Sequence, residues 1–144
     1  MVEFYINLLL NLHNLGKMCI FAKKKFDMME RDVIFVEDVL LPSGSTYSGE
    51  AIQVSPVSVE ITGKGKSIHV DGSEYEGQFK YGIPFGYGIY TFAGGDFHVG
   101  FFDDLPNGPG YLCLNSVKGM TLGQYKNGKL NGWAIGLKYG NFNC

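Results

Sequence analysis

Apolar and polar side chains alternate along the second half of the chain. Tyr75, Gly77 and Phe79 occupy every second position, and polar or charged residues stand between them. Because successive side chains of a β-strand point to opposite faces, this pattern predicts a strand with one ring-bearing face and one polar face. A second alternation follows at once and places four residues on one face: Gly86, Gly88, Tyr90 and Phe92. Together the two runs predict a β-hairpin.

The hairpin pattern recurs at a fixed step along the sequence. Units begin at Tyr75, His98 and Thr121, a step of 23 residues each time. The third place is always glycine and the fifth is always aromatic: Gly77, Gly100 and Gly123, then Phe79, Phe102 and Tyr125. An earlier copy begins at Tyr47 with a step of 28, which we attribute to about five residues inserted in a connecting loop around 53–59. A degenerate half-unit is expected before it.

This repetition predicts an array of hairpins over residues 33–144. Its expected units are 33–46, 47–74, 75–97, 98–120 and 121–144. Asp71-Gly72 and Asn127-Gly128 are hairpin-turn dipeptides, because glycine supplies the positive φ that such turns need. We expect the bare glycines inside the strands to leave slots that neighbouring rings fill, which makes the aromatic stripe the main stabiliser of a thin sheet.

Residues 1–32 form a separate segment with a helical pattern. Phe4, Leu8, Leu12 and Leu15 fall at helical spacing, so we expect a short amphipathic helix that packs on the sheet or on a partner. Polar residues interrupt the segment too often for a membrane-spanning helix. The early charge is Glu3 rather than a basic residue, which argues against a secretory signal. An organelle-targeting presequence stays open as an alternative.

Composition and charge agree with a β-rich binding domain. The chain has 21 glycines and 15% aromatic residues, and only 18% of its residues are charged. This much glycine disfavours helices, because an interior glycine costs about 0.5–1 kcal/mol relative to alanine. The net charge is −2, and residues 74–144 carry five basic and five acidic residues, so no nucleic-acid partner is predicted. Three cysteines without a metal-type spacing indicate a reducing, intracellular compartment.

No arrangement of residues in the sequence predicts catalysis or a metal site. The stretch 63–67 resembles a phosphate loop but has Glu60 where that motif needs its first glycine. The three histidines are far apart, and Asp103-Asp104 has the character of a turn. Cys113 lies in an apolar strand and is predicted to be a core residue rather than a nucleophile. We therefore expect no catalytic residue, no metal site and no cofactor.

The repeated pattern of tyrosine, glycine and aromatic positions resembles that of the MORN family (membrane occupation and recognition nexus repeats). The match is strongest in residues 75–97, and Thr121–Ala134 follows it well. His98 replaces the leading tyrosine of its unit, and Ala51 replaces the fifth-place aromatic of the earliest full unit. The resemblance implies a mostly β fold: a single-layer, elongated, twisted antiparallel sheet of tandem hairpins, preceded here by the short N-terminal helix.

The resemblance also implies a non-catalytic scaffold or adaptor that holds proteins together in cytoskeletal, ciliary or membrane-associated assemblies. MORN repeats also accompany catalytic domains in lipid kinases and methyltransferases, but we expect none in this chain. A protein partner, in the form of a helix or peptide, is expected to bind an aromatic groove. Our candidates for that groove are Tyr75, Phe79, Tyr90, Phe92, Phe102, Tyr125 and Trp133.

Two further modes of association follow from the same features. The edges of an open sheet, expected at Val33–Leu41 and Trp133–Phe142, invite strand pairing, so a homodimer through the edges is one expectation. The alternative function is binding to anionic phospholipid, for which Lys23, Lys24 and Lys25 are best placed. We expect the protein inside the cell, in the cytoplasm or on the cytoskeleton. A cilium and an organelle stay open.

Overall fold

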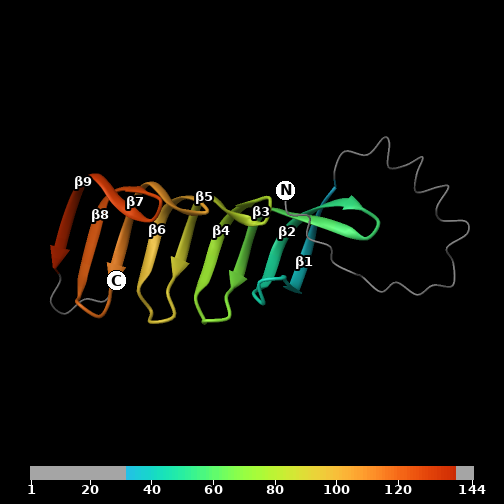
Figure 1. Cartoon of the computed structure of the whole chain (residues 1–144), viewed down its shortest axis with the longest axis horizontal. Coiled ribbons are helices and arrows are strands. Elements are labelled where there is room, and N and C mark those ends of the chain that lie inside the picture. The colour runs from blue at the N-terminus through green and yellow to red at the C-terminus, as the bar shows by residue number, and fades with distance from the viewer. Residues whose placement is uncertain (1–31, 139–144) are drawn as a thin grey trace, which may run out of the picture.

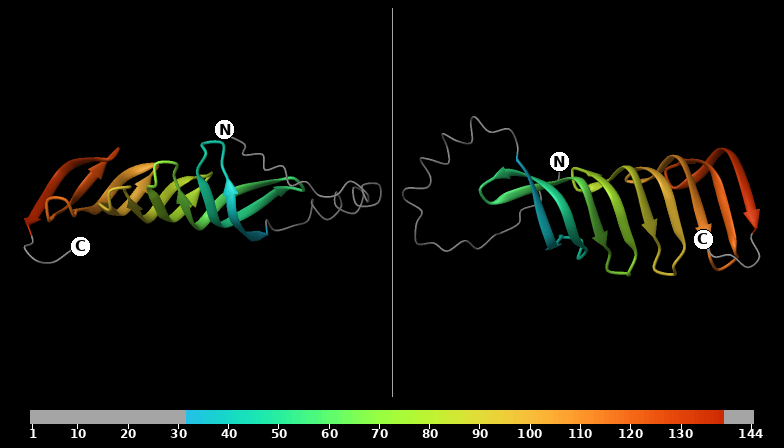
Figure 2. Two further views of the ribbon diagram at one scale, coloured as in Figure 1. Left: turned by 90° about the horizontal axis from the view of Figure 1, so that it is seen from below. Right: turned by 180° about the vertical axis from the view of Figure 1, so that it is seen from behind.

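The computed structural model describes residues 32–138, which form one nine-stranded antiparallel sheet. The strands pair in chain order, so neighbours in sequence are also neighbours in space (Figure 1). Figure 2 shows a single twisted layer, elongated across its strands. The strands are β1 (Val33–Leu40), β2 (Thr46–Ser55), β3 (Ser58–Ile68), β4 (Glu74–Lys80), β5 (Ile83–Thr91), β6 (Phe97–Asp103), β7 (Leu105–Leu114), β8 (Gly119–Lys126) and β9 (Lys129–Lys138).

This architecture confirms the predicted single-layer antiparallel sheet. No helix occurs within residues 32–138, and the predicted N-terminal helix lies outside the described residues. The β8–β9 turn is the predicted Asn-Gly pair, with φ of 49° at Asn127 and 76° at Gly128. The β4–β5 turn has the same geometry, with 54° at Tyr81 and 77° at Gly82. Positive φ at both central residues matches the twist of the strands that such turns join.

The insertion in the earliest full unit is not a loop, so that prediction was wrong. Its residues continue both strands, and β2 and β3 reach Ser55 and Ser58, leaving only Pro56 and Val57 between them. The longer hairpin extends beyond its neighbours at one end of the sheet (Figure 1). Alternating polar and β-branched residues suit extended pairing, which explains why the added residues lengthen the hairpin.

A row of small residues crosses the sheet from β2 to β9. Each member pairs in register with the next: Gly49, Gly65, Gly77, Gly88, Gly100, Gly110, Gly123 and Ala134. The row is closely covered on one face. A Cβ added at Gly65 would collide with the ring of Tyr47, and one added at Gly88 with that of Tyr75. The glycines therefore leave the slots for rings that the sequence predicted.

The rings on this face form a zigzag of edge-on contacts along the array. Tyr75 meets Phe79 of its own unit at 5.1 Å between ring centroids and Phe102 of the next unit at 5.0 Å. His98 in turn meets Phe102 at 5.5 Å and Tyr125 at 4.5 Å. Each edge-on pair adds about 0.5–1.5 kcal/mol beyond area burial. This side, which we call the ring face, therefore holds the core and couples each repeat to the next.

The two edge strands differ in their protection. β1 contains a bulge where Asp38 adopts a φ of 49° and its amide donates a hydrogen bond to the Ser48 hydroxyl at 2.9 Å. β9 pairs only with β8 among the described residues, and all ten of its residues are exposed. Bulges and inward charges discourage further strand pairing, so β1 is the guarded edge and β9 the open one.

Candidate interaction surface

The tyrosines of the ring face are anchored by their hydroxyl groups. Tyr47 donates a hydrogen bond to the Glu50 carbonyl oxygen at 2.7 Å, and Tyr75 donates to that of Gln78 at 2.9 Å. Each acceptor lies three residues after its tyrosine, at a bulge in the strand. Burial raises the pKa of Tyr75 to about 12, because the charged phenolate would lose its hydration. These phenols are structural groups and remain protonated at neutral pH.

His98 occupies the equivalent place in the next unit but lacks this anchor. Its side chain is only 2% exposed, and its Nε2 has no hydrogen-bond partner among the described residues. Burial lowers the pKa of His98 to about 4, because the sheet stabilises the neutral ring over the imidazolium. The ring packs like the tyrosines it replaces, but its Nε2 lacks the hydrogen bond that their hydroxyl groups make.

The structure divides the seven predicted groove rings into two groups. Tyr75, Phe79, Phe102 and Tyr125 are buried in the core, Tyr90 is half-buried, and Phe92 and Trp133 are exposed. Only exposed or half-buried rings are accessible to a partner without unfolding the array. The role of all seven in partner binding stays a prediction, and the accessible apolar surface lies mainly elsewhere.

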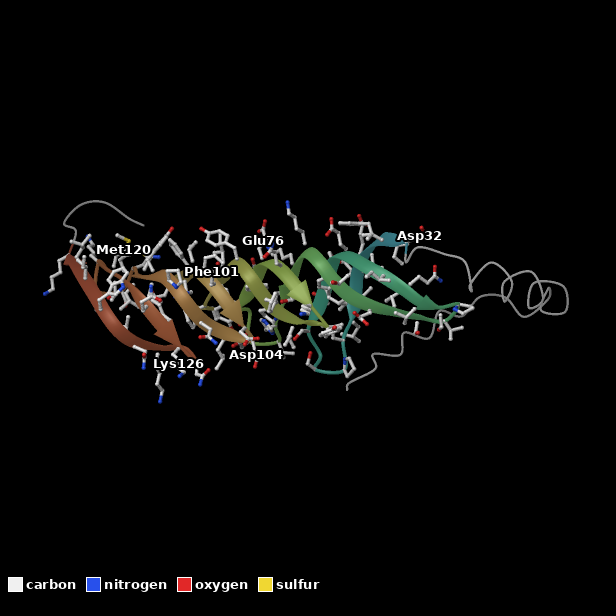
Figure 3. All side chains as sticks on the ribbon, turned by 90° about the horizontal axis from the view of Figure 1, so that it is seen from above. Asp32, Glu76, Phe101, Asp104, Met120 and Lys126 are labelled. Carbon is white, nitrogen blue, oxygen red and sulfur yellow. The ribbon has the colours of Figure 1, made fainter. Side chains whose placement is uncertain are left out.

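That surface is the opposite side of the sheet, which we call the open face. One row of apolar residues crosses it in register from β5 to β9: Ile89, Val99, Tyr111, Leu122 and Ile135. Tyr87 and Phe101 form a neighbouring cross-strand pair, with ring centroids 5.8 Å apart. Figure 3 shows the labelled Glu76, Phe101 and Met120 side chains on the same side of the ribbon. Tyr87 is 54% exposed and Trp133 is 53% exposed, so much of the apolar surface meets solvent.

A shallow trough runs over the glycine row on this face. Over β2–β5 it encloses about 660 Å³, with glycines as its floor and polar side chains such as Lys64, Lys66 and Glu76 among its walls. Lys66 is paired with Glu74, their Nζ and Oε2 atoms 2.6 Å apart. The walls are polar beside β3 and β4, whereas Tyr87 and Ile89 of β5 line the end of the trough with apolar side chains.

Two side-chain hydrogen bonds at the strand bulges were not predicted from the sequence. The carboxylate of Glu50 accepts a hydrogen bond from the Lys64 amide at 2.7 Å, and the Gln78 side-chain oxygen accepts one from the Tyr87 amide at 3.1 Å. Gly63 and Gly86, at φ of 72° and 71°, leave room for these groups. In the sequence, Glu50 and Gln78 both stand in the fourth place of their units. Their hydrogen-bond donors lie on the adjacent strand, however, and the repeat pattern does not show which residues those are.

Charge is separated along the array. The sequence contains no Asp or Glu after Asp104, whereas 105–138 carry Lys118, Lys126, Lys129 and Lys138. All four lie at the ends of β8 and β9 or in the turn before β8. Strands β8 and β9 therefore carry a positive charge that no acidic residue of 105–138 offsets.

The remaining candidate chemistry gives no further site in the part of the chain that the structure describes. Residues 32–138 contain no cluster of His, Cys, Asp and Glu suited to a metal ion. Cys113 is fully buried, as predicted for a core residue, so its sulfur is not accessible as a nucleophile. Among the described residues no helix is long and apolar enough to cross a bilayer. Lys23, Lys24 and Lys25 lie outside the described residues.

Comparison with known proteins agrees with the hairpin geometry. A model of the MORN repeat family matches residues 75–97 and 122–132. These segments cover the β4–β5 hairpin and much of the β8–β9 hairpin. No curated protein matches the chain. MORN repeats are commonly protein or membrane interaction modules, and the family is generally non-enzymatic. With its ring-stacked hairpins and these two matched segments, the chain contains MORN repeats in its β4–β5 and β8–β9 hairpins.

Proposed function

We propose that this protein is a non-catalytic scaffold that binds a protein partner through the apolar part of its open face. One observation carries the proposal: Ile89, Leu122 and Ile135, which belong to one in-register row, remain exposed on the face opposite the core, although Val99 of the same row is buried. Isolated exposed apolar residues need no explanation, but a contiguous apolar patch on a soluble domain marks an interaction site. The ring face already provides the packing of the array, so these residues are not needed for it.

The exposed group has the composition of a protein-binding surface. Tyr87, Phe101 and Trp133 are half-exposed aromatics, and Leu122 and Ile135 are exposed aliphatic residues that pair across β8 and β9. Aromatic residues dominate the energetics of protein interfaces, because they bury large areas at little cost in conformational entropy. Membership of a cytoskeletal, ciliary or membrane-associated assembly is part of this proposal and depends on the identity of the partner.

The proposal is tested by affinity capture from the native source with matched variants. Ile135→Gln and Trp133→Gln remove apolar groups from the open face, and Val70→Gln changes an even more exposed apolar residue in the β3–β4 turn. We expect the wild type and the Val70 variant to retain the same partner and the open-face variants to lose at least tenfold of it. Equal capture by all four proteins would overturn the proposal. Capture of lipid vesicles alone would replace it with membrane binding.

A further inference from the structure

We infer that two copies of this protein pair through the free edges of their β9 strands, in antiparallel register, and so form one continuous sheet. The inference goes beyond the proposed scaffold function and concerns a second copy of the chain rather than another protein. Three features of β9 carry it: its unpaired edge, its uncharged apolar sequence and the match of that sequence to itself when it is reversed.

Strand β9 presents a full edge of backbone groups. Among the described residues it pairs only with β8, and all ten of its residues are exposed. Residues 130–137 include no charged residue and no proline. Four of them are large apolar residues that are about half-exposed: Leu130, Trp133, Ile135 and Leu137. An uncharged apolar edge strand is a template for a further strand, because its outward N–H and C=O groups still require partners.

The opposite edge of the sheet is a poorer partner for β9. Strand β1 is bulged between Val36 and Val39, and Glu37 and Asp38 lie within that bulge. Nine strands that alternate in direction also leave β1 and β9 running the same way. With the ring faces on one side, β9 can meet β1 of another copy only in parallel, and parallel pairing is slightly less stable per residue. These features favour a closed pair of β9 strands over a head-to-tail chain of copies.

The sequence of β9 matches itself when two copies run in opposite directions. A two-fold axis normal to the sheet keeps both open faces on the same side, so open-face side chains lie opposite one another. With this axis at Ile135, Ile135 lies opposite its own copy and Trp133 lies opposite Leu137 of the second copy. All three side chains are on the open face, where Ile135 pairs with Leu122 of β8. Directly opposed apolar side chains are the main source of stability between two strands.

Other registers of the two strands match less well. In the register centred on residue 135, the ring face sets Ala134 opposite Gly136 of the second copy, so no bulky groups collide there. A shift of the axis by one or two residues toward the N-terminus would set Leu137 opposite Asn131 or Lys129. A shift toward the C-terminus would move the tryptophan past the end of β9. The central register therefore opposes the most apolar side chains within β9.

The charges around β9 permit this approach of two copies. Residues 92–138 contain four lysines and three aspartates, which gives a net charge of +1: Lys118, Lys126, Lys129, Lys138, Asp96, Asp103 and Asp104. In the central register Lys138 lies opposite Gly132 of the second copy, which is about 10 Å along the strand from Lys129. That separation exceeds the Debye length of about 8 Å at physiological salt, so repulsion between these lysines is largely screened.

The pair would extend the open face across both copies. The apolar row that contains Leu122 and Ile135 would continue into Ile135 and Leu122 of the second copy. Nine strands span about 38 Å and eighteen about 82 Å across the sheet. Two copies in one sheet would present their apolar surfaces on the same side, which allows a divalent partner to bind both.

Sedimentation equilibrium and small-angle X-ray scattering of the purified 144-residue chain test the inference. We expect a monomer–dimer equilibrium in which the dimer is about twice as long as the monomer. Ile89→Lys changes an exposed apolar residue of the same face on β5, away from the edge, and should leave the equilibrium unchanged. A monomer at every concentration would overturn the inference. So would a compact dimer that Ile89→Lys dissociates, which would have its open faces packed together, or species that grow beyond a dimer, which would be paired head to tail.

A matched pair of double variants tests the register. Trp133→Glu with Leu137→Lys sets opposite charges against each other across the interface, whereas Trp133→Lys with Leu137→Lys sets like charges there. Both variants change the same two exposed residues, and circular dichroism should show that both are folded. We expect the first variant to dimerise at least tenfold more tightly than the second, with a smaller difference at high salt. Equal dimerisation of the two variants, or none by either, would overturn the inference.

The two proposals fail separately. Self-association is measured with the purified chain alone, so it does not depend on whether another protein is captured. If the chain stays monomeric while capture of the native partner still depends on Ile135, the proposed function stands and the pairing of β9 strands is excluded. If the chain dimerises in the expected register while Ile135→Gln captures the partner as well as the wild type does, the pairing stands and the proposed function fails.

Discussion

The two faces of the sheet use the same residue types for different purposes. Tyr75 on the ring face is fully buried against glycines and two phenylalanines, whereas Tyr87, one hairpin strand away, is 54% exposed on the open face. Both lie in strands of the unit that best matches the family. The difference shows that a single-layer sheet needs only one packed face. The other face is free to present apolar groups to a partner.

The largest expected effect comes from removing a ring-face tyrosine. Tyr75→Ala deletes a ring that fills the slot over Gly88 and bridges two repeats, and we expect it to lower the free energy of unfolding by about 3–5 kcal/mol. Tyr87→Ala removes the same side chain from the open face and should cost less than about 1 kcal/mol. Urea unfolding measures both. Similar losses of unfolding free energy in the two variants would contradict the assignment of a packed ring face and an exposed open face.

The glycine row gives a sharper version of the same comparison. A methyl group at Gly88 would lie 2.6 Å from the Cζ of Tyr75, whereas one at Gly94 meets no atom within 4 Å. We expect Gly88→Ala to destabilise the protein by about 1–3 kcal/mol through overpacking. Gly94→Ala should be neutral or stabilise it by up to about 1 kcal/mol. Thermal unfolding separates the two. A neutral Gly88→Ala would show that the ring does not depend on a bare backbone.

The buried histidine makes the stability of the ring face depend on pH. The pKa of His98 is about 4 in the folded protein against an ordinary value near 6.5, so the unfolded chain takes up a proton that the native ring does not. Stability is therefore intact above about pH 6.5 and falls as the pH drops toward 4. We expect the free energy of unfolding to fall by about 1–3 kcal/mol over this range. The lower values apply if solvent screens the charged ring at this thin sheet. His98→Phe should remove this component of the unfolding profile, and an unchanged profile would refute its origin.

The smallest expected effect is a gain in stability. His98→Tyr restores the residue that leads the other ring-bearing units, and its hydroxyl can reach the Phe101 carbonyl as that of Tyr75 reaches Gln78. One buried hydrogen bond gained and one unbonded nitrogen removed are worth about 1 kcal/mol. Differential scanning calorimetry should show a higher Tm. A lower Tm would mean that this unit is shaped for histidine.

Much of this architecture was readable in the sequence because its period is local. The alternation around Tyr75 and the third-place glycines predicted the strands, the packed face and the slots for rings. The open face was harder to predict, because no local sequence pattern requires its residues to be apolar. Leu122 and Ile135 become one surface only through the register of β8 with β9.

The groove prediction shows the same limit. It selected Phe79, Phe102 and Tyr125 from their place in the repeat, and the structure buries these rings between neighbouring units. Sequence position showed which residues are aromatic, but it could not show which rings cover one another. That depends on contacts between repeats, such as the 4.5 Å approach of Tyr125 to His98. The inserted residues of the β2–β3 hairpin likewise lengthened strands, because cross-strand pairing decided their conformation.

The separation of the two faces is tested most directly by site-specific photo-crosslinking to the captured partner. A photoreactive residue is placed at Leu122 on the open face, at Phe92 beside the ring face, and at Val70 in a turn, all of which are exposed. The account predicts that the partner is crosslinked from position 122 and not from 92 or 70. Crosslinking from position 92 or 70 without crosslinking from 122 would contradict it and would move the binding site away from the open face.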